Sequence, residues 1–257
     1  MLSVVSSVLV RCAVAVAAGA LLSMPVAQAA AVPGQGTWET TLQGRDLDGN
    51  ALNGFEAYYD TALNITWLAD ANLAKTSGYS ARGFFSWADA SEWVAQLDVG
   101  GVTGWRLPTM VDTGVGGCGV IANGGSDCGY NADTSTSELA HMFYVTLGNK
   151  AQKSPTGATQ SGSGLSNSGP FVNLRSGSFS YWVDAGVPSS SGYAWFFGTG
   201  SGIQNMTNKR NTLLAWAVHA GDVAALSDVS SPVPEPETLA LVLAGVGATL
   251  LMRRRGQ

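Results

Sequence analysis

The hexapeptide GWRLPT, residues 104–109, says more about the fold than any other stretch of this chain. Trp105 and Leu107 alternate with Arg106, so an extended backbone directs the two apolar side chains into a core and the arginine to the opposite side. Pro108 ends the segment because it lacks the N–H of a strand residue, and Thr109 is free to begin a turn. We interpret Arg106 first as an internal partner of carboxylates or backbone carbonyls, and second as a ligand-binding residue.

Short β-favouring runs on both sides of the hexapeptide predict strands. The runs at 54–60 and 64–70 are separated by a turn, which predicts a hairpin. Further strands are predicted at 171–175, 179–184, 193–198 and 213–218. Five tryptophans fall at core-like positions, and Trp195 can face either side of its strand; the five are Trp67, Trp87, Trp93, Trp182 and Trp216.

Two segments have helical periodicity. The first follows Ser86, a candidate N-cap, and runs to about Asp98, before Gly100-Gly101; its apolar positions are Trp87, Ala90, Val94 and Leu97. The second begins at Ser135, with Glu138 completing a capping box, and Gly148 stops it; its apolar face is Leu139, Met142, Phe143 and Leu147. Because the elements show neither βαβ alternation nor a repeat, they predict an α+β fold with short antiparallel strands, two main helices and long loops.

The first 29 residues have the features of a secretory signal peptide. Arg11 precedes an apolar stretch from Cys12 to Leu22, and residues 27–29 form an A-x-A cleavage pattern. Cleavage is predicted after Ala29, with Ala30 as the alternative. The chain is therefore expected to be exported through the Sec machinery.

The last 24 residues, 234–257, combine a short motif, an apolar run and a basic cluster. The motif is Pro234, Glu235 and Pro236, the apolar run is 238–252, and the cluster is Arg253, Arg254 and Arg255. A 15-residue helix is roughly 22 Å long, short of the ~30 Å hydrocarbon core, and the arginines are expected to stay cytoplasmic. This order resembles a PEP-CTERM sorting tail, which implies a Gram-negative exporter and processing by an exosortase-like membrane protease. A plain single-span anchor is the alternative.

The part between these ends is acidic. Residues 30–230 carry nine Lys and Arg against sixteen Asp and Glu, a net charge of about −7, and they contain all eight tryptophans. No basic stripe is present, which argues against nucleic acid as a partner. Bare anionic lipid or polymer is expected to be repelled unless a cation bridges the two.

Two cysteines remain after removal of the signal peptide, Cys118 and Cys128, in a glycine-rich segment. In an oxidising compartment such a local pair predicts a disulfide, worth roughly 2.5–3 kcal/mol through chain entropy. A zinc site is disfavoured because no nearby His or Cys pair completes it.

Patterns that carry catalysis or bind metals are weak in this sequence. His141 and His219 belong to no metal-binding spacing, and there is no G-x-S-x-G elbow. Residues 45–50 faintly resemble a calcium loop, but the glycine is two positions early and position twelve is Ala57 rather than glutamate. A polar turn is the preferred interpretation, and we expect no cofactor, no resident metal and no catalytic residues.

Several motifs occur in an order typical of one family. They are Tyr59-Asp60, 65–68, 87–90, the hexapeptide, 137–139, 181–182 and 215–218. This order resembles the Lcl C-terminal-type domain, which is related in fold to C-type lectins and to the formylglycine-generating enzyme. The family often ends its last strand with arginine where this chain has His219, so a role for a guanidinium there is not carried over. Nothing matches the paired redox cysteines near the C-terminus of the formylglycine-generating enzyme.

The sequence therefore predicts five segments. They are a signal peptide (1–29), an N-terminal extension (30–54), an Lcl C-terminal-like domain (55–222), a linker (223–233) and a sorting tail (234–257) whose span is 238–252. We expect a protein held briefly in the inner membrane and then placed at the cell surface or outside the cell. Its expected function is non-catalytic binding or adhesion in an exopolysaccharide or biofilm matrix. The alternatives are a structural matrix protein without a discrete ligand, or an enzyme.

Overall fold

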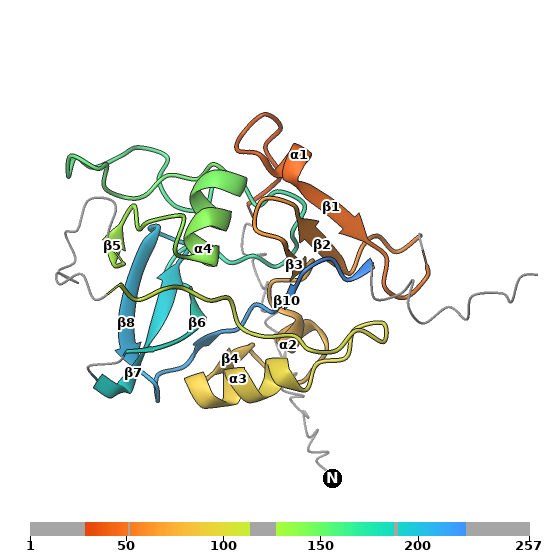
Figure 1. Ribbon diagram of the computed structural model, residues 1–257. Coiled ribbons are helices and arrows are strands. Elements are labelled where there is room, and N and C mark those ends of the chain that lie inside the picture. Colours follow the sequence, from red (N-terminus) through yellow and green to blue (C-terminus); the bar gives the residue numbers. More distant parts are fainter. Residues whose placement is uncertain (1–28, 51, 114–126, 188–189, 225–257) are drawn as a thin grey trace, which may run out of the picture.

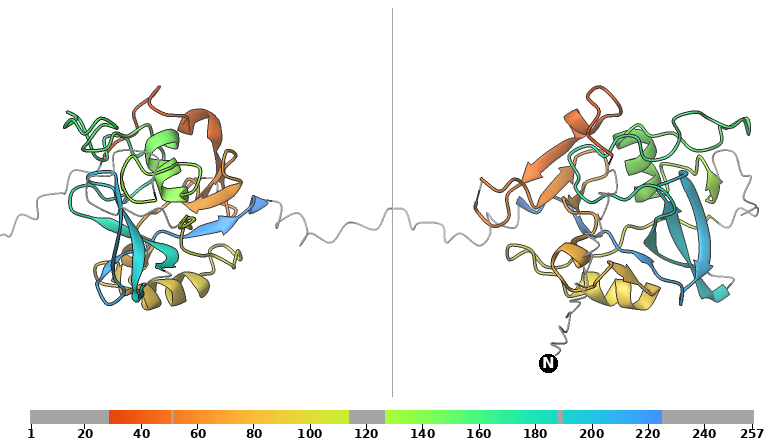
Figure 2. Two further views of the ribbon diagram at one scale, coloured as in Figure 1. Left: turned by 60° about the vertical axis from the view of Figure 1, so that its left-hand side comes forward. Right: turned by 180° about the vertical axis from the view of Figure 1, so that it is seen from behind.

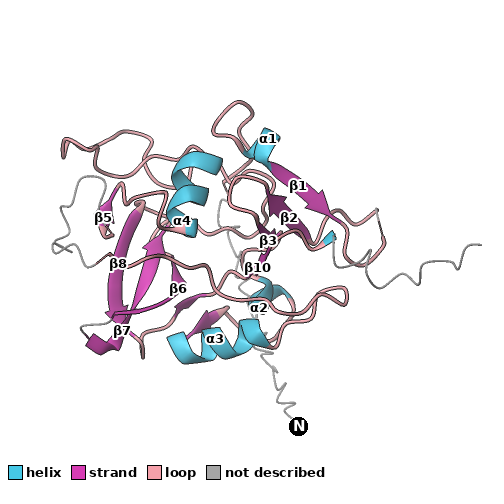
Figure 3. Ribbon diagram, viewed as in Figure 1, coloured by secondary structure: helices cyan, strands magenta, loops and turns pink. Residues whose placement is uncertain are grey.

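The structure is a computed structural model that describes residues 29–50, 52–113, 127–187 and 190–224. The sorting tail, most of the signal peptide and linker, and Cys118 lie outside these residues. The described part is a mixed α+β fold in which strands outweigh helices and long loops connect them (Figure 3).

A four-stranded antiparallel sheet forms one side of the molecule (Figure 1). Its order is β1-β2-β3-β10, with β1 at Leu42–Arg45, β2 at Ala57–Asp60, β3 at Ile65–Leu68 and β10 at Val218–Ala220. The predicted hairpin is confirmed as β2 and β3, with Asn64 at a φ of 53° in the turn between them. The predicted N-terminal extension supplies β1, preceded by the short helix α1 (Trp38–Thr41), and so adds the edge strand of this sheet.

A six-stranded sheet forms the other side, in the order β4-β9-β6-β7-β8-β5. Its members are β4 (Phe84–Phe85), β5 (Gly129–Tyr130), β6 (Ser180–Val187), β7 (Ser190–Gly198), β8 (Ile203–Asn208) and β9 (Leu213–Leu214). Every pair is antiparallel except β6 with β9, which meet in parallel at a single position. The predicted strands at 179–184 and 193–198 are confirmed within β6 and β7.

Two strand predictions were wrong. Residues 171–175 form a loop with a single bridge between Val172 and Asp70, because Phe171 and Leu174 point into the core from irregular backbone. The predicted strand 213–218 is divided between β9 and β10, which belong to different sheets. The residues between them, 215–217, are buried and carry the chain from one sheet to the other.

The main helices lie at opposite ends of the molecule in every view (Figure 2). Helix α3 spans Trp87–Ala95, shorter than predicted, and Ser86 caps it by accepting from the Asp89 N–H at 3.3 Å. Helix α4 spans Glu138–His141 and continues as the π-helical turn η1, Met142–Thr146. A further short helix, α2, spans Leu73–Thr76.

The predicted capping box at Ser135 was wrong. Helix α4 begins after Ser137, whose Oγ accepts from the Ala140 N–H at 3.2 Å. Ser135 instead bonds Asp133, with 2.7 Å between Ser135 Oγ and Asp133 Oδ1. The predicted end is confirmed, since Leu147 closes the helix and Gly148 follows with a φ of 63°. All four residues of the predicted apolar face are buried.

Tryptophans organise the core between the sheets. Trp216 packs on Trp67 at 4.6 Å and on Phe171 at 4.8 Å between ring centroids, and its indole N–H donates to the Leu68 carbonyl at 2.8 Å. Trp195, undecided from sequence, is buried. Among residues 29–50, 52–113, 127–187 and 190–224, no helix is both long enough and apolar enough to cross a membrane.

Candidate binding site

The hexapeptide GWRLPT joins three elements of the fold. The Arg106 N–H and carbonyl both bond Val218 of β10 at 2.8 Å, while the Pro108 carbonyl accepts from Asp184 of β6 at 2.7 Å. Thr109 N–H donates to Glu138 Oε2 of α4 at 2.7 Å. Trp105 and Leu107 are buried as predicted.

The Arg106 side chain is used inside the fold. Its guanidinium makes a two-point ion pair with Glu138, at 2.8 Å and 2.7 Å, and also donates to the Leu107 carbonyl. This confirms the first interpretation of Arg106, as an internal partner of carboxylates and carbonyls. It also explains why Glu138 does not complete a capping box: its carboxylate faces the hexapeptide.

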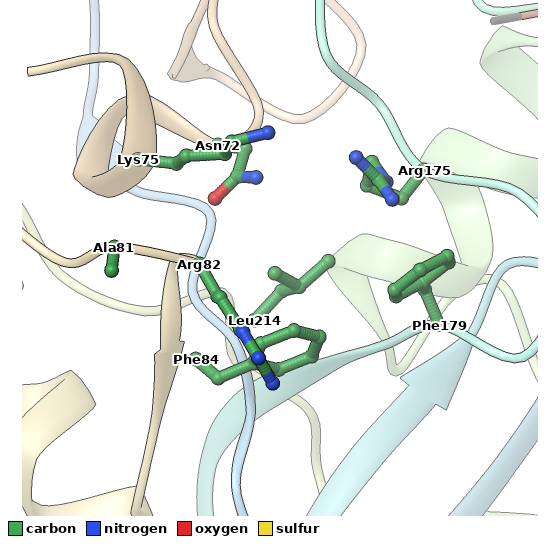
Figure 4. Close-up of a pocket in the computed structure, with 8 residues that line it drawn as sticks. All are labelled: Asn72, Lys75, Ala81, Arg82, Phe84, Arg175, Phe179 and Leu214. Carbon is green, nitrogen blue, oxygen red and sulfur yellow. The ribbon is translucent and has the colours of Figure 1, made fainter. Parts of the chain in front are cut away.

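A cavity of about 210 Å³ opens between α2, the start of β4, β9 and the loop before β6 (Figure 4). Figure 4 shows Asn72 and Lys75 along its upper edge, Arg175 with Phe179 at its right, and Arg82, Phe84 and Leu214 below. Ala81 completes the lining. We call this cavity the cationic pocket, because three of its eight lining residues are basic and none is acidic.

Within the described part of the chain, the cations of this pocket have no carboxylate partners. The two ion pairs among the described residues are Arg45 with Asp222 and Arg106 with Glu138, so neither involves Lys75, Arg82 or Arg175. These three are one third of the nine basic residues between 30 and 230. A domain that is acidic as a whole therefore has a locally positive cavity.

Two polar atoms of the cationic pocket are buried without a hydrogen-bond partner: Asn72 Oδ1 and Arg175 Nε. Asn72 is only 2% exposed. Gly83 leaves room for its side chain, because a Cβ at this glycine, whose φ is +75°, would collide with Asn72 Oδ1. Buried polar groups in folded proteins are nearly always satisfied, so one unmatched acceptor and one unmatched donor at the same cavity are unusual.

Arg175 is positioned by its backbone and by an aromatic ring. Its N–H donates to Tyr181 Oη at 3.0 Å, and its carbonyl accepts from Thr199 Oγ1 at 2.5 Å. Burial raises the pKa of Tyr181, which keeps that hydroxyl neutral. The guanidinium carbon lies 4.3 Å from the Phe179 ring centroid, a cation–π contact. Phe179 in turn stacks on Phe84 at 6.0 Å, so the two rings form an apolar wall.

A second cavity of about 210 Å³, to which Leu73 of α2 contributes, has the opposite character. Apolar side chains line it together with Glu56 and Asp70. Asp70 already accepts hydrogen bonds from the Asn72 N–H, Thr76 and Asn173. Of these two cavities, only the cationic pocket has basic side chains in its lining.

The loop with faint calcium-site character brings three carboxylates together. Oxygens of Asp46, Asp48 and Glu56 lie within 4.8 Å of one another. Glu56 was not part of the sequence pattern. Each carboxylate also accepts backbone hydrogens: Asp46 from Gly49, Asp48 from Asn50 and Glu56 from Leu47. These bonds are those of the polar turn favoured from the sequence.

The histidines and the described cysteine are placed away from the cationic pocket's lining. His219 packs edge-on against Trp105, with ring centroids 5.7 Å apart. His141, in α4, lies near the buried carboxylate of Asp60 and bonds the Thr134 carbonyl at 3.3 Å. Cys128 is buried. Its predicted partner Cys118 lies outside the described residues, so the disulfide stays a prediction. The sorting-tail residues 234–236 and 253–255 lie outside them as well.

Sequence reasoning missed the cationic pocket entirely. Lys75, Arg82 and Arg175 are separated by up to a hundred positions and belong to no motif. The hexapeptide, one of the motifs behind the resemblance, has its tryptophan and leucine in the core and its arginine paired with Glu138. No protein-family model matches this chain, and neither a curated protein nor a solved structure is significantly similar to it.

Proposed function

We propose that this chain is an exported protein whose folded part is a non-catalytic binding module of the cell surface or extracellular matrix. The observation that carries the proposal is the cationic pocket, in which unpaired basic side chains and an unsatisfied buried amide surround an aromatic wall. Such convergence of a few polar groups on an apolar cavity is typical of ligand sites. We further propose that the domain has the C-type-lectin-like fold of the Lcl C-terminal type, which the short antiparallel strands and long loops support.

The proposed route to the surface rests on the two ends of the sequence. The signal peptide 1–29 directs the chain to the Sec machinery, and the tail 234–257 presents its Pro-Glu-Pro motif to an exosortase-like membrane protease. This route places the protein among the matrix polysaccharides of the producing cell, which we therefore propose as its partner. Mass spectrometry of the mature protein is expected to find a chain that begins at Ala30 or Ala31; an intact Met1 contradicts export by this route.

A glycan array tests the binding function. The purified protein is applied with calcium and again with a chelator, which also reports on the carboxylates of Asp46, Asp48 and Glu56. Reproducible and saturable signals are expected. Flat traces in both conditions favour the structural matrix role instead. Turnover of a substrate that disappears on changing one residue contradicts the non-catalytic assignment.

A further inference from the structure

We propose that the cationic pocket binds one acidic sugar unit, a uronate, through its carboxylate and a neighbouring hydroxyl. This inference rests on the proposed binding function and names the chemistry that the site recognises.

The first step concerns charge. Lys75 and Arg82 are exposed at the pocket, Arg175 is partly buried beside them, and no lining residue is acidic. Guanidinium groups present paired donors that match a carboxylate, and an ammonium adds a point charge. A ligand group of negative charge is therefore favoured here, and a cationic one is disfavoured.

The second step concerns the two unsatisfied atoms. Arg175 Nε–H needs an acceptor, and Asn72 Oδ1 needs a donor. A fully ionised sulfate offers acceptors alone and so leaves Asn72 unmatched. A neutral sugar offers hydroxyl donors but no charge for the three cations. A uronate has both a carboxylate and hydroxyl groups, so it offers an acceptor to Arg175 and a donor to Asn72.

The third step concerns size and the apolar wall. Phe84, Phe179 and Leu214 give the pocket one hydrocarbon side, against which the C–H face of a sugar ring can pack. The cavity, about 210 Å³, is smaller than the ~300 Å³ at which pockets for drug-sized ligands begin. One sugar unit, with the rest of a polymer outside, suits this volume.

The fourth step is compatibility with the acidic domain. An anionic polymer is repelled by a net charge of about −7 at long range, but at physiological salt this repulsion is screened beyond roughly 8 Å. Contact at the three cations is local and persists. From composition alone, we expected an anionic polymer to be repelled unless a cation bridged it to the protein. In the cationic pocket, the protein's own basic side chains take the place of that cation.

Calorimetric titration of the full-length protein in mild detergent tests the assignment with sodium glucuronate, glucose and sodium sulfate as probes. Glucuronate is expected to bind at least about tenfold more tightly than either of the others. Arg82→Gln, at an exposed position, is expected to weaken glucuronate binding about tenfold without changing the circular dichroism spectrum. Arg210→Gln removes the same charge from an exposed position outside the pocket and is expected to change nothing.

Asn72→Asp is the second variant, because it keeps an acceptor for the hydroxyl and adds a negative charge to the pocket that holds the ligand's carboxylate. It is expected to abolish glucuronate binding. Equal binding of glucose and glucuronate, sulfate as tight as glucuronate, or an Arg82→Gln protein that binds like wild type each overturns the assignment. If the wild-type protein binds neutral glycans on the array but does not bind glucuronate in the calorimeter, the binding module stands and the pocket assignment fails. Flat arrays together with no glucuronate binding reject both proposals.

Discussion

Arg106 illustrates how one side chain can look like a binding residue in sequence and serve the fold in the structure. Its guanidinium and Glu138 are both partly buried, with exposed side-chain fractions of 29% and 16%. The two parallel hydrogen bonds between them need the planar fork of arginine. They tie the hexapeptide to the first turn of α4.

Arg106→Lys is expected to destabilise the protein by about 1–2 kcal/mol, because an ammonium cannot make the two-point contact with Glu138. Urea unfolding measures the change as a lower midpoint at an unchanged slope. Arg210→Lys, at an exposed arginine, is the matched control and should lie within about 0.5 kcal/mol of wild type. Equal midpoints for the two variants would contradict the structural role.

Asp60 has the opposite character, a carboxylate buried without an ion pair. It accepts from the N–H groups of Ala62 and Leu63 and from Thr146 Oγ1, yet desolvation raises its pKa above the ordinary value. Because the folded pKa is the higher one, the folded state binds the proton more tightly. The contribution of Asp60 to the free energy of unfolding is therefore fully present below the pKa of the unfolded state. It is lost as the pH rises through the pKa of the folded state.

Asp60→Asn is therefore expected to be more stable relative to wild type at pH 8 than at pH 4. Each unit by which the pKa is raised contributes about 1.4 kcal/mol to the difference. Thermal unfolding of both proteins across this range measures it, and titrating groups that do not interact with Asp60 cancel in the comparison. His141 acts on the Asp60 carboxylate, so the same pair is also compared in a His141→Gln background. A stability gap that stays constant with pH would show that the Asp60 pKa is not raised.

At the scale of elements, local signals were enough for some pieces and misleading for others. The β2–β3 hairpin and helix α3 were predicted because a turn, a serine cap and a 3.6-residue period all lie within a few residues of one another. Strand β8 was missed because its sequence, IQNMTN, is mostly polar. The division of 213–218 between two sheets depends on packing of Trp216 against Trp67, which no local pattern encodes.

The candidate site was harder to predict than the fold for a related reason. Its cations come from α2, from the segment before β4 and from the loop before β6. Nothing near Lys75 or Arg82 in the sequence indicates that Arg175 is their neighbour. The unsatisfied Asn72 Oδ1 is visible only once the surrounding backbone is placed.

The start of α4 gives a test at this scale. Ser137 Oγ accepts from the Ala140 N–H and donates to the buried Gln204 Oε1 at 2.6 Å. Ser137→Ala is expected to cost about 2–3 kcal/mol, since it removes a cap and leaves a buried acceptor unmatched. Ser135→Ala, at the cap predicted from sequence, should cost less than about 0.5 kcal/mol in the same denaturant titration. If Ser135→Ala destabilised the protein more than Ser137→Ala, the helix would begin at Ser135, as predicted from the sequence.

At the scale of the whole molecule, both ends of the domain are fastened close to the predicted processing segments. The Ala30 carbonyl accepts from the Ser168 N–H at 3.2 Å, and the Val32 N–H donates to Asn167 Oδ1 at 2.8 Å. Cleavage after Ala29 leaves both bonds in place. Near the other end, Asp222 makes a two-point ion pair with Arg45 of β1 at 2.6 Å, which anchors the chain before the linker.

Because these contacts do not involve the tail, we expect the domain to keep its structure when the tail is removed. The role of the tail motif can therefore be tested separately from folding. Glu235→Ala is expected to leave export intact yet trap the protein in the inner membrane. The apolar run 238–252 still inserts and the arginines 253–255 still hold its end in the cytoplasm, because neither depends on Glu235. Only the motif at the outer boundary changes, where the residue before Pro236 is biased away from helix and the segment stays accessible to a protease.

Cell fractionation measures the outcome. The wild-type protein should leave the inner membrane as a species lacking roughly the last twenty residues, because cleavage at the motif removes the apolar run and the arginines together. The variant should remain full-length in the inner membrane. A matched change in the linker, Ser230→Ala, controls for effects of any substitution in this region and should behave like wild type. If wild type and Glu235→Ala fractionate identically and both keep Arg253, Arg254 and Arg255, the tail is a simple anchor.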